Sequence, residues 1–196
     1  SNHKILSASI RQEPNGSYYI SINTEFEKEI KPVPSDNNII GLDFSMKELF
    51  VSSENQRADY PRFFRKLESK LIKAQRKLSR MIKFSNNWYK QKTIVAKIHN
   101  KIKNSRLDFL HKFSFNLVNK YNAICIEDLN MKAMSKALHF GKSVADNGWG
   151  MFTNMLEYKT IFTGKQLVKI DKFFPSSKTC SFCGAIKTDL KLSDRT

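Results

Sequence analysis

Cysteines, long apolar runs and, over one long stretch, acidic residues are scarce in this sequence of 196 residues. The three cysteines are too few for a disulfide framework. No stretch approaches the roughly 18 to 20 consecutive apolar residues of a membrane span, and no signal peptide opens the chain. These absences exclude a disulfide-stabilised secreted domain and predict a protein of the cell interior without a membrane partner.

Positive charge is concentrated in one segment. The chain carries 34 Lys and Arg against 18 Asp and Glu, a net charge of +16. Between Arg62 and Lys112 there are 16 Lys and Arg and two acids, so this segment alone carries +14. Such one-sided charge favours a polyanionic partner, nucleic acid above all, and the alternative is a solvated face that binds nothing. The candidate nucleic-acid-binding residues are Arg62, Arg65, Lys66, Lys73, Arg76, Lys77, Arg80 and Lys83.

The apolar pattern predicts strands and helices that alternate along the chain. An Asn-Gly turn between β-forming runs predicts a hairpin over 4–26. Short apolar runs predict further strands at 39–43, 48–52, 123–127 and 166–171. Apolar residues spaced by three and four predict helices at 61–81, 88–102, 107–121 and 148–162. The order of these elements indicates an α/β fold with a mixed sheet and a basic helical hairpin.

Two of the predicted strands end in an acid, Asp43 in one and Glu127 in the other. If these strands are neighbours, both carboxylates converge on one spot, where an ionised pair requires a cation. Carboxylate oxygens suit Mg²⁺, and metal ions held there could support phosphodiester cleavage. The alternative is that each acid only ends its strand and faces water.

A Cys-x-x-Cys-Gly motif lies near the end of the sequence, with Cys180 and Cys183 as its thiols. Two thiolates supply half of a tetrahedral zinc site, which needs four ligands. No second pair follows, and Cys125 lies in an apolar run far upstream. The motif therefore indicates the start of a zinc ribbon, and we expect the chain to be a piece of a longer protein.

The two tryptophans are interpreted as core residues. For Trp88, which follows the break between the first two predicted helices, stacking on a nucleic-acid base is the alternative. Trp149 begins the last predicted helix and has no such alternative.

Several motifs resemble those of TnpB proteins, which are transposon-encoded, RNA-guided relatives of type V CRISPR nucleases. The segments GLDFSMK at 41–47 and IEDLNM at 126–131 resemble the first two catalytic motifs of that family. Three further stretches match the family's pattern, at 61–66, 146–152 and 174–184. The similarity runs nearly end to end in the family's order, and the chain is identified as a member on this resemblance.

The resemblance implies a RuvC-like nuclease domain of the RNase H fold. Asp43 and Glu127 would be its first two catalytic, metal-binding acids, with Mg²⁺ or Mn²⁺ as cofactor. Cys180 and Cys183 would be the first half of a ribbon that binds Zn²⁺ when complete. The implied domains are a hairpin and linker ending a WED-like β-barrel (1–36), the nuclease domain with a helical insertion at 61–104 (37–171), and an incomplete zinc ribbon (172–196).

For function, the resemblance implies the nuclease part of an RNA-guided DNA endonuclease, with guide RNA and target DNA as partners. Its place would be the cytoplasm of a prokaryotic cell, at the nucleoid when bound to DNA. The sequence lacks the family's third catalytic Asp, so whether this chain alone is an enzyme stays open. The alternative is a catalytically incomplete RNA- and DNA-binding protein, a repressor or remnant. A third hypothesis is a non-catalytic RNA- or DNA-binding α/β scaffold whose basic helical hairpin is its only functional element.

Overall fold

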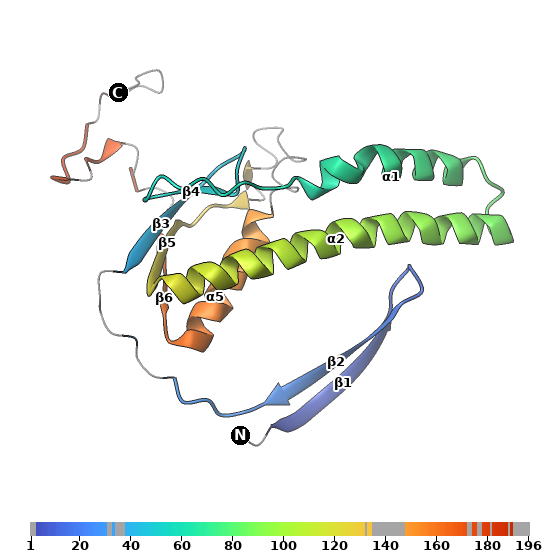
Figure 1. The fold of residues 1–196 in the computed structure, drawn as a ribbon, viewed down its shortest axis with the longest axis horizontal. Coiled ribbons are helices and arrows are strands. Elements are labelled where there is room, and N and C mark those ends of the chain that lie inside the picture. The colour runs from blue at the N-terminus through green and yellow to red at the C-terminus, as the bar shows by residue number, and fades with distance from the viewer. Residues whose placement is uncertain are drawn as a thin grey trace.

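The computed structural model describes residues 3–30, 33, 38–131, 133–134, 148–171, 174–175, 178–180, 182–187 and 189. In these ranges a four-stranded sheet packs against helices, a helical arm projects from it, and a separate β-hairpin runs alongside (Figure 1). None of the helices described is both long enough and apolar enough to cross a membrane.

The sheet has the strand order β4-β3-β5-β6. Its strands are β3 (Ile39–Phe44), β4 (Phe50–Ser52), β5 (Ala123–Glu127) and β6 (Gln166–Ile170). β3, β5 and β6 are parallel, and β4 is the antiparallel edge strand beside β3. The predicted mixed α/β sheet is confirmed, and its parallel connections are made by helices, as such crossovers require.

One face of the sheet is closed by helices α2 (Asn86–Lys120) and α5 (Trp149–Thr163). Every second residue of β3 and β5 points into this core, which is the period of a half-buried strand. Trp149, expected in the core, is 2% exposed. The most deeply buried strand and helix residues are Ile40, Leu42, Ile124, Ile126, Leu110, Phe152 and Leu156.

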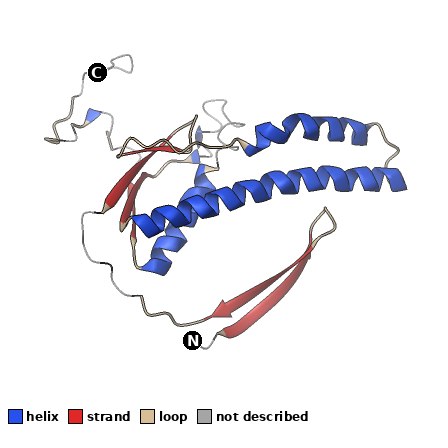
Figure 2. Ribbon diagram, viewed as in Figure 1, coloured by secondary structure: helices blue, strands red, loops and turns tan. Residues whose placement is uncertain are grey.

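The helical arm consists of α1 (Phe63–Ser79) and the first half of α2, joined by a turn as predicted (Figure 2). A small cluster of Leu71, Ile98 and Ile102 holds the two helices together. The predicted boundary between helices at 88–102 and 107–121 is wrong, because α2 is continuous over 35 residues, about 52 Å. No Gly or Pro stands at 103–106 to end it, and its apolar stripe passes from the arm into the sheet core.

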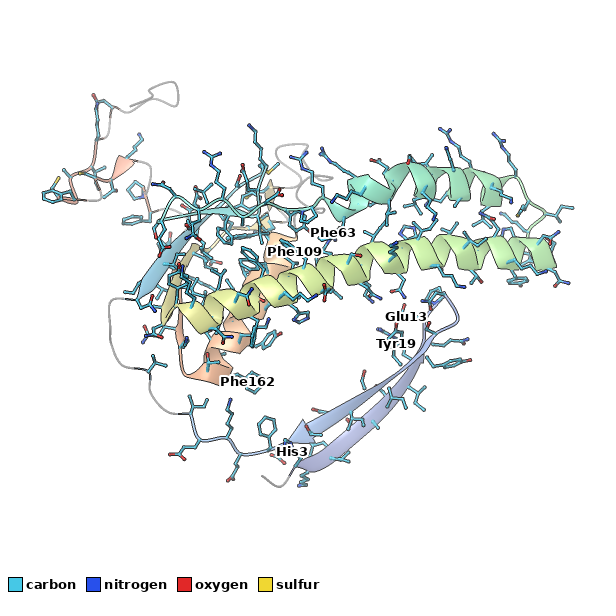
Figure 3. The ribbon with its side chains drawn as sticks, in the orientation of Figure 1. His3, Glu13, Tyr19, Phe63, Phe109 and Phe162 are labelled. Carbon is cyan, nitrogen blue, oxygen red and sulfur yellow. The ribbon has the colours of Figure 1, made fainter. Side chains whose placement is uncertain are left out.

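The β-hairpin, formed by β1 (Lys4–Gln12) and β2 (Tyr18–Glu25), confirms the predicted Asn-Gly turn, where Gly16 has a φ of 89°. Its strands are exposed on both faces. At the turn, the Glu13 carboxylate lies 3.6 Å from the Lys103 ammonium of α2. Past β2, the Lys28 ammonium donates a 2.7 Å hydrogen bond to the carbonyl oxygen of Phe162, the residue of α5 that Figure 3 labels. The hairpin is therefore attached at two places near its ends.

Candidate metal centre and nucleic-acid interface

Asp43 and Glu127 lie at the carboxyl ends of adjacent parallel strands. In the register of β3 and β5, Leu42 is the partner of Ile126, so the next position of each strand places Asp43 beside Glu127. Leu42 and Ile126 point into the core, and the two acids therefore point to the opposite face of the sheet. The structure brings together the two carboxylates that the sequence singled out.

The environment of this pair disfavours a second negative charge. Partial burial, followed by the neighbouring Glu127 carboxylate, raises the pKa of Asp43, and a hydrogen bond from the Phe44 backbone offsets part of the effect. Asp43 still contacts solvent, so a hydrated ion could reach it. A divalent cation would relieve the repulsion, and carboxylate oxygens are the ligands that Mg²⁺ and Mn²⁺ prefer. The pair fits part of a metal site, since no cluster of three or more metal-ligating side chains occurs in the part of the chain described here.

A pocket of about 430 Å³ opens beside Glu127, between the end of β5 and the first turns of α5. Its polar lining includes Asp128, Asn130, Asn154 and Lys169. The Lys169 ammonium pairs with the Glu157 carboxylate at 3.2 Å. Sheets of this class commonly bind ligands outside the carboxyl ends of their strands. Sequence reasoning missed Asn154 and Lys169, because only the packing of α5 beside β5 and β6 brings them near the acids.

The Cys-x-x-Cys motif forms a compact knuckle. The Cys180 N–H donates to the Ala185 carbonyl oxygen at 2.8 Å, and the Gly184 N–H returns to the Cys180 carbonyl oxygen at 2.9 Å. Hydrogen bonds from the backbone N–H groups of Cys183 and then Phe182 lower the pKa of the Cys180 thiol. Both thiols are exposed. A thiolate favoured in this way fits a zinc ligand, and the knuckle could supply two of the four ligands that a closed site needs.

The eight predicted nucleic-acid-binding residues all have exposed side chains. Five of them lie on α1, on the side away from its inner residues Leu67, Leu71 and Ala74, and the other three, Arg62, Arg80 and Lys83, flank the helix. The helical period explains this separation, since the apolar stripe must face α2. The structure thus places these cations on one continuous outer face of the arm.

Helix α2 adds cations that the sequence analysis counted in the charged segment without assigning them a role. Lys90, Lys97 and Lys101 are exposed and lie on one side of the helix. Their spacing of seven and four residues was the signal that could have identified them. The basic surface of the arm is therefore larger than the set of eight residues.

Solved structures of Cas12f share this arrangement of elements. The match to "Cryo-EM structure of the Cas12f1-sgRNA-target DNA complex" has a TM-score of 0.60 at 16% identity, over 95% of this chain and 39% of that one. A second match, "Cryo-EM structure of CRISPR-Cas12f Ternary Complex", has a TM-score of 0.52 at 18% identity, over 90% of this chain and 36% of that one. At such identities the likeness concerns the fold, which is that of a Cas12f-like mixed α/β protein.

The sequence comparisons define the family within that class. The model of the OrfB/IS605 family, described as "Probable transposase", matches residues 21–138, and the Cas12f1-like TNB domain matches 149–196. The chain belongs to the OrfB/IS605 family, to which the TnpB resemblance pointed.

Two curated relatives carry the name "Putative RNA-guided DNA endonuclease". The protein of Streptomyces pristinaespiralis is 34% identical over 95% of this chain and 46% of its own length. InsQ of Escherichia coli K12 is 33% identical over 91% of this chain and 48% of its own length. The chain thus spans about half the length of the curated relatives that it matches.

Proposed function

We propose that this chain is the nuclease part of an RNA-guided DNA endonuclease with a RuvC-like, RNase H-type domain at 37–171. The observation that carries the proposal is the adjacency of Asp43 and Glu127 at the ends of two parallel strands. Two divalent ions held by such carboxylates would supply a metal-activated water and charge stabilisation for phosphodiester hydrolysis. Asp43 and Glu127 would be first-sphere ligands, and remaining ligands would come from residues beyond this pair.

The other elements receive roles that fit this proposal. The exposed cations of the arm would contact phosphates of guide RNA and target DNA, so binding should weaken steeply with salt. The hairpin within 1–36 would complete a WED-like barrel, for which its two exposed faces leave room. The knuckle of Cys180 and Cys183 would begin a zinc ribbon over 172–196.

The metal site can be tested on the chain itself. Mn²⁺ binding is measured by calorimetry in the wild type and in Asp43→Asn and Glu127→Gln. Each substitution should weaken binding by about tenfold or more, because one charged ligand is lost. The matched control is Asp108→Asn, an exposed acid of α2 that pairs with Lys112 at 2.8 Å in its own helix. Equal Mn²⁺ affinity in all four proteins would overturn the site.

Cleavage is tested in a protein extended to the length of its relatives. Asp43→Asn should abolish Mg²⁺-dependent cutting of DNA and leave guide-dependent DNA binding intact. If the unsubstituted protein binds DNA with its guide but yields no cleaved product, the catalytically incomplete binding protein becomes the better account. The basic face of α1 would serve that function equally well, since it does not depend on the acids.

A further inference from the structure

The turn that ends the helical arm exposes large apolar side chains in the most basic part of the molecule. Ile82 is 83% exposed, Phe84 72% and Tyr89 50%. Phe84 and Tyr89 both pack against Trp88, with ring centroids 5.5 Å and 5.1 Å from it. The expectation that Trp88 is a core residue is wrong, because it is only half-buried and supports two exposed rings. We call Ile82, Phe84, Trp88 and Tyr89 the aromatic tip.

The backbone of the turn is strained at Phe84. Phe84 has a φ of 67°, in the left-handed region where a side chain is disfavoured and Gly is the usual residue. The turn is held by the Ser85 N–H and hydroxyl, which both donate to the Ile82 carbonyl oxygen, at 3.3 Å and 2.9 Å. The Ser85 hydroxyl also accepts the Trp88 N–H at 3.2 Å and caps α2. A Gly at position 84 would make the same turn without strain, so the backbone of the turn does not itself require an aromatic ring there.

The charge around the aromatic tip decides what kind of partner fits it. No Asp or Glu occurs from residue 69 to 107, while Arg80, Lys83, Lys90 and Lys92 lie close to the rings in the sequence. The Lys92 ammonium lies 5.1 Å from the centre of the Trp88 ring. A second copy of this chain would bring two such cationic tips together, which like-charge repulsion disfavours. Phosphates flanking a base would instead be attracted, and exposed aromatic rings within a basic surface suit stacking with unpaired bases.

We propose that the aromatic tip binds single-stranded DNA by stacking unpaired bases on Phe84 and Tyr89. This inference rests on the proposed function for its partner. When a guide pairs with one strand of a duplex, the other strand is displaced and its bases lose their partners, whereas guide bases become paired. The displaced strand is therefore the component with free base faces. Stacking tolerates any sequence, as a protein with a changeable guide requires.

The test compares a DNA 12-mer containing 2-aminopurine with the same strand made abasic at its central positions. The wild-type chain should quench 2-aminopurine and bind the strand with bases about tenfold or more tightly than the abasic strand, since stacking of even one base has that magnitude. Phe84→Gly combined with Tyr89→Leu should remove the quenching and equalise the two affinities. Phe115→Leu is the matched control, because Phe115 is 56% exposed on α2 outside the turn, and it should change neither.

Folding and binding are separated by the single variant Phe84→Gly. Its thermal unfolding temperature should change little, because relief of the backbone strain offsets the lost contact with Trp88, while quenching falls. A wild type that binds both strands equally tightly overturns the stacking inference alone. A wild type that binds neither strand overturns the proposed nucleic-acid function as well. Tighter binding of the matching RNA strand refutes the assignment to DNA. A dimer that Tyr89→Leu dissociates, with DNA affinity unchanged, shows an interface between copies instead.

Discussion

The two halves of helix α2 have the same local structure and differ in what they pack against. The half after residue 103 contributes Leu110, Leu117 and Val118 to the large core beneath the sheet. The half before it packs against α1 through a cluster of three buried residues, and it also borders the hairpin turn at Glu13. One half positions the carboxylate pair, and the other presents charge and aromatic rings to solvent. The comparison teaches that burial, rather than helix formation, assigns the role of each half.

The largest expected effect is a loss of stability in the core beneath the sheet. Phe152 is fully buried and packs between Trp149 and Phe50, with ring centroids 5.6 Å and 5.8 Å away. Phe152→Ala should lower the free energy of unfolding by about 3–5 kcal/mol, because it leaves a cavity that the core cannot fill. Denaturant unfolding followed by tryptophan fluorescence measures this loss. Phe115→Ala, at an exposed site of α2, should cost less than about 0.5 kcal/mol. Equal losses for the two would contradict the assignment of the core.

The second effect concerns the outer face of the arm. Charge reversal of Lys73, Arg76, Lys77 and Arg80 to Glu should lower nucleic-acid affinity by about two orders of magnitude and flatten its salt dependence. Stability should hardly change, since these side chains are exposed. Exchanging Lys and Arg at the same four sites keeps the charge and should keep most of the affinity. Fluorescence anisotropy over a salt series distinguishes the variants, and an unchanged affinity after reversal would remove the role given to this face.

A smaller effect is expected at the inner face of the arm. Leu71 is 3% exposed, but its cluster has only two other buried members, and the helices can close around a smaller side chain. Leu71→Ala should therefore cost about 2 kcal/mol, the low end for such a substitution. Hydrogen exchange should speed up in α1 and in the first half of α2 while the sheet stays protected. Ile72→Ala, at the exposed neighbouring position, is the control. Loss of protection in the sheet would show that the two halves of α2 unfold together.

The smallest effect is a pH dependence at the acids. Because the pKa of Asp43 is raised on folding, the folded protein binds this proton more tightly than the unfolded chain does. Stability should fall as the pH rises from the ordinary carboxyl pKa through the raised one. In EDTA at neutral pH, Asp43→Asn should raise the free energy of unfolding by at most about 1 kcal/mol, since the site is partly solvated. The gain should vanish at a pH below both pKa values. A variant that is less stable at neutral pH would contradict this account.

Much of the fold could be predicted because its signals are local. Alternation, apolar runs and the Asn-Gly turn predicted each strand, and the period of α1 separated its cations from its apolar stripe. The length of α2 was not predicted, because the polar residues 103–106 separate its two apolar stretches, although no Gly or Pro among them ends the helix. The helix continues because its first apolar stretch packs against α1 and its second against the sheet. These two partners lie along one line only in the folded chain.

The candidate site divides in the same way. Asp43 and Glu127 were recognisable as acids that end apolar strands, and Cys180 and Cys183 as a pair of thiols three positions apart. The sequence by itself determined these residues and the basic outer face, because spacing and composition suffice for them, and its motifs carried the resemblance that pointed to the family. Only the tertiary structure decided that the two carboxylates are adjacent, that Lys169 lines a pocket beside them, and that Phe84 and Tyr89 face solvent. Each of these depends on strand register or on which surfaces the rest of the chain covers, and both are set by contacts between segments far apart in the sequence.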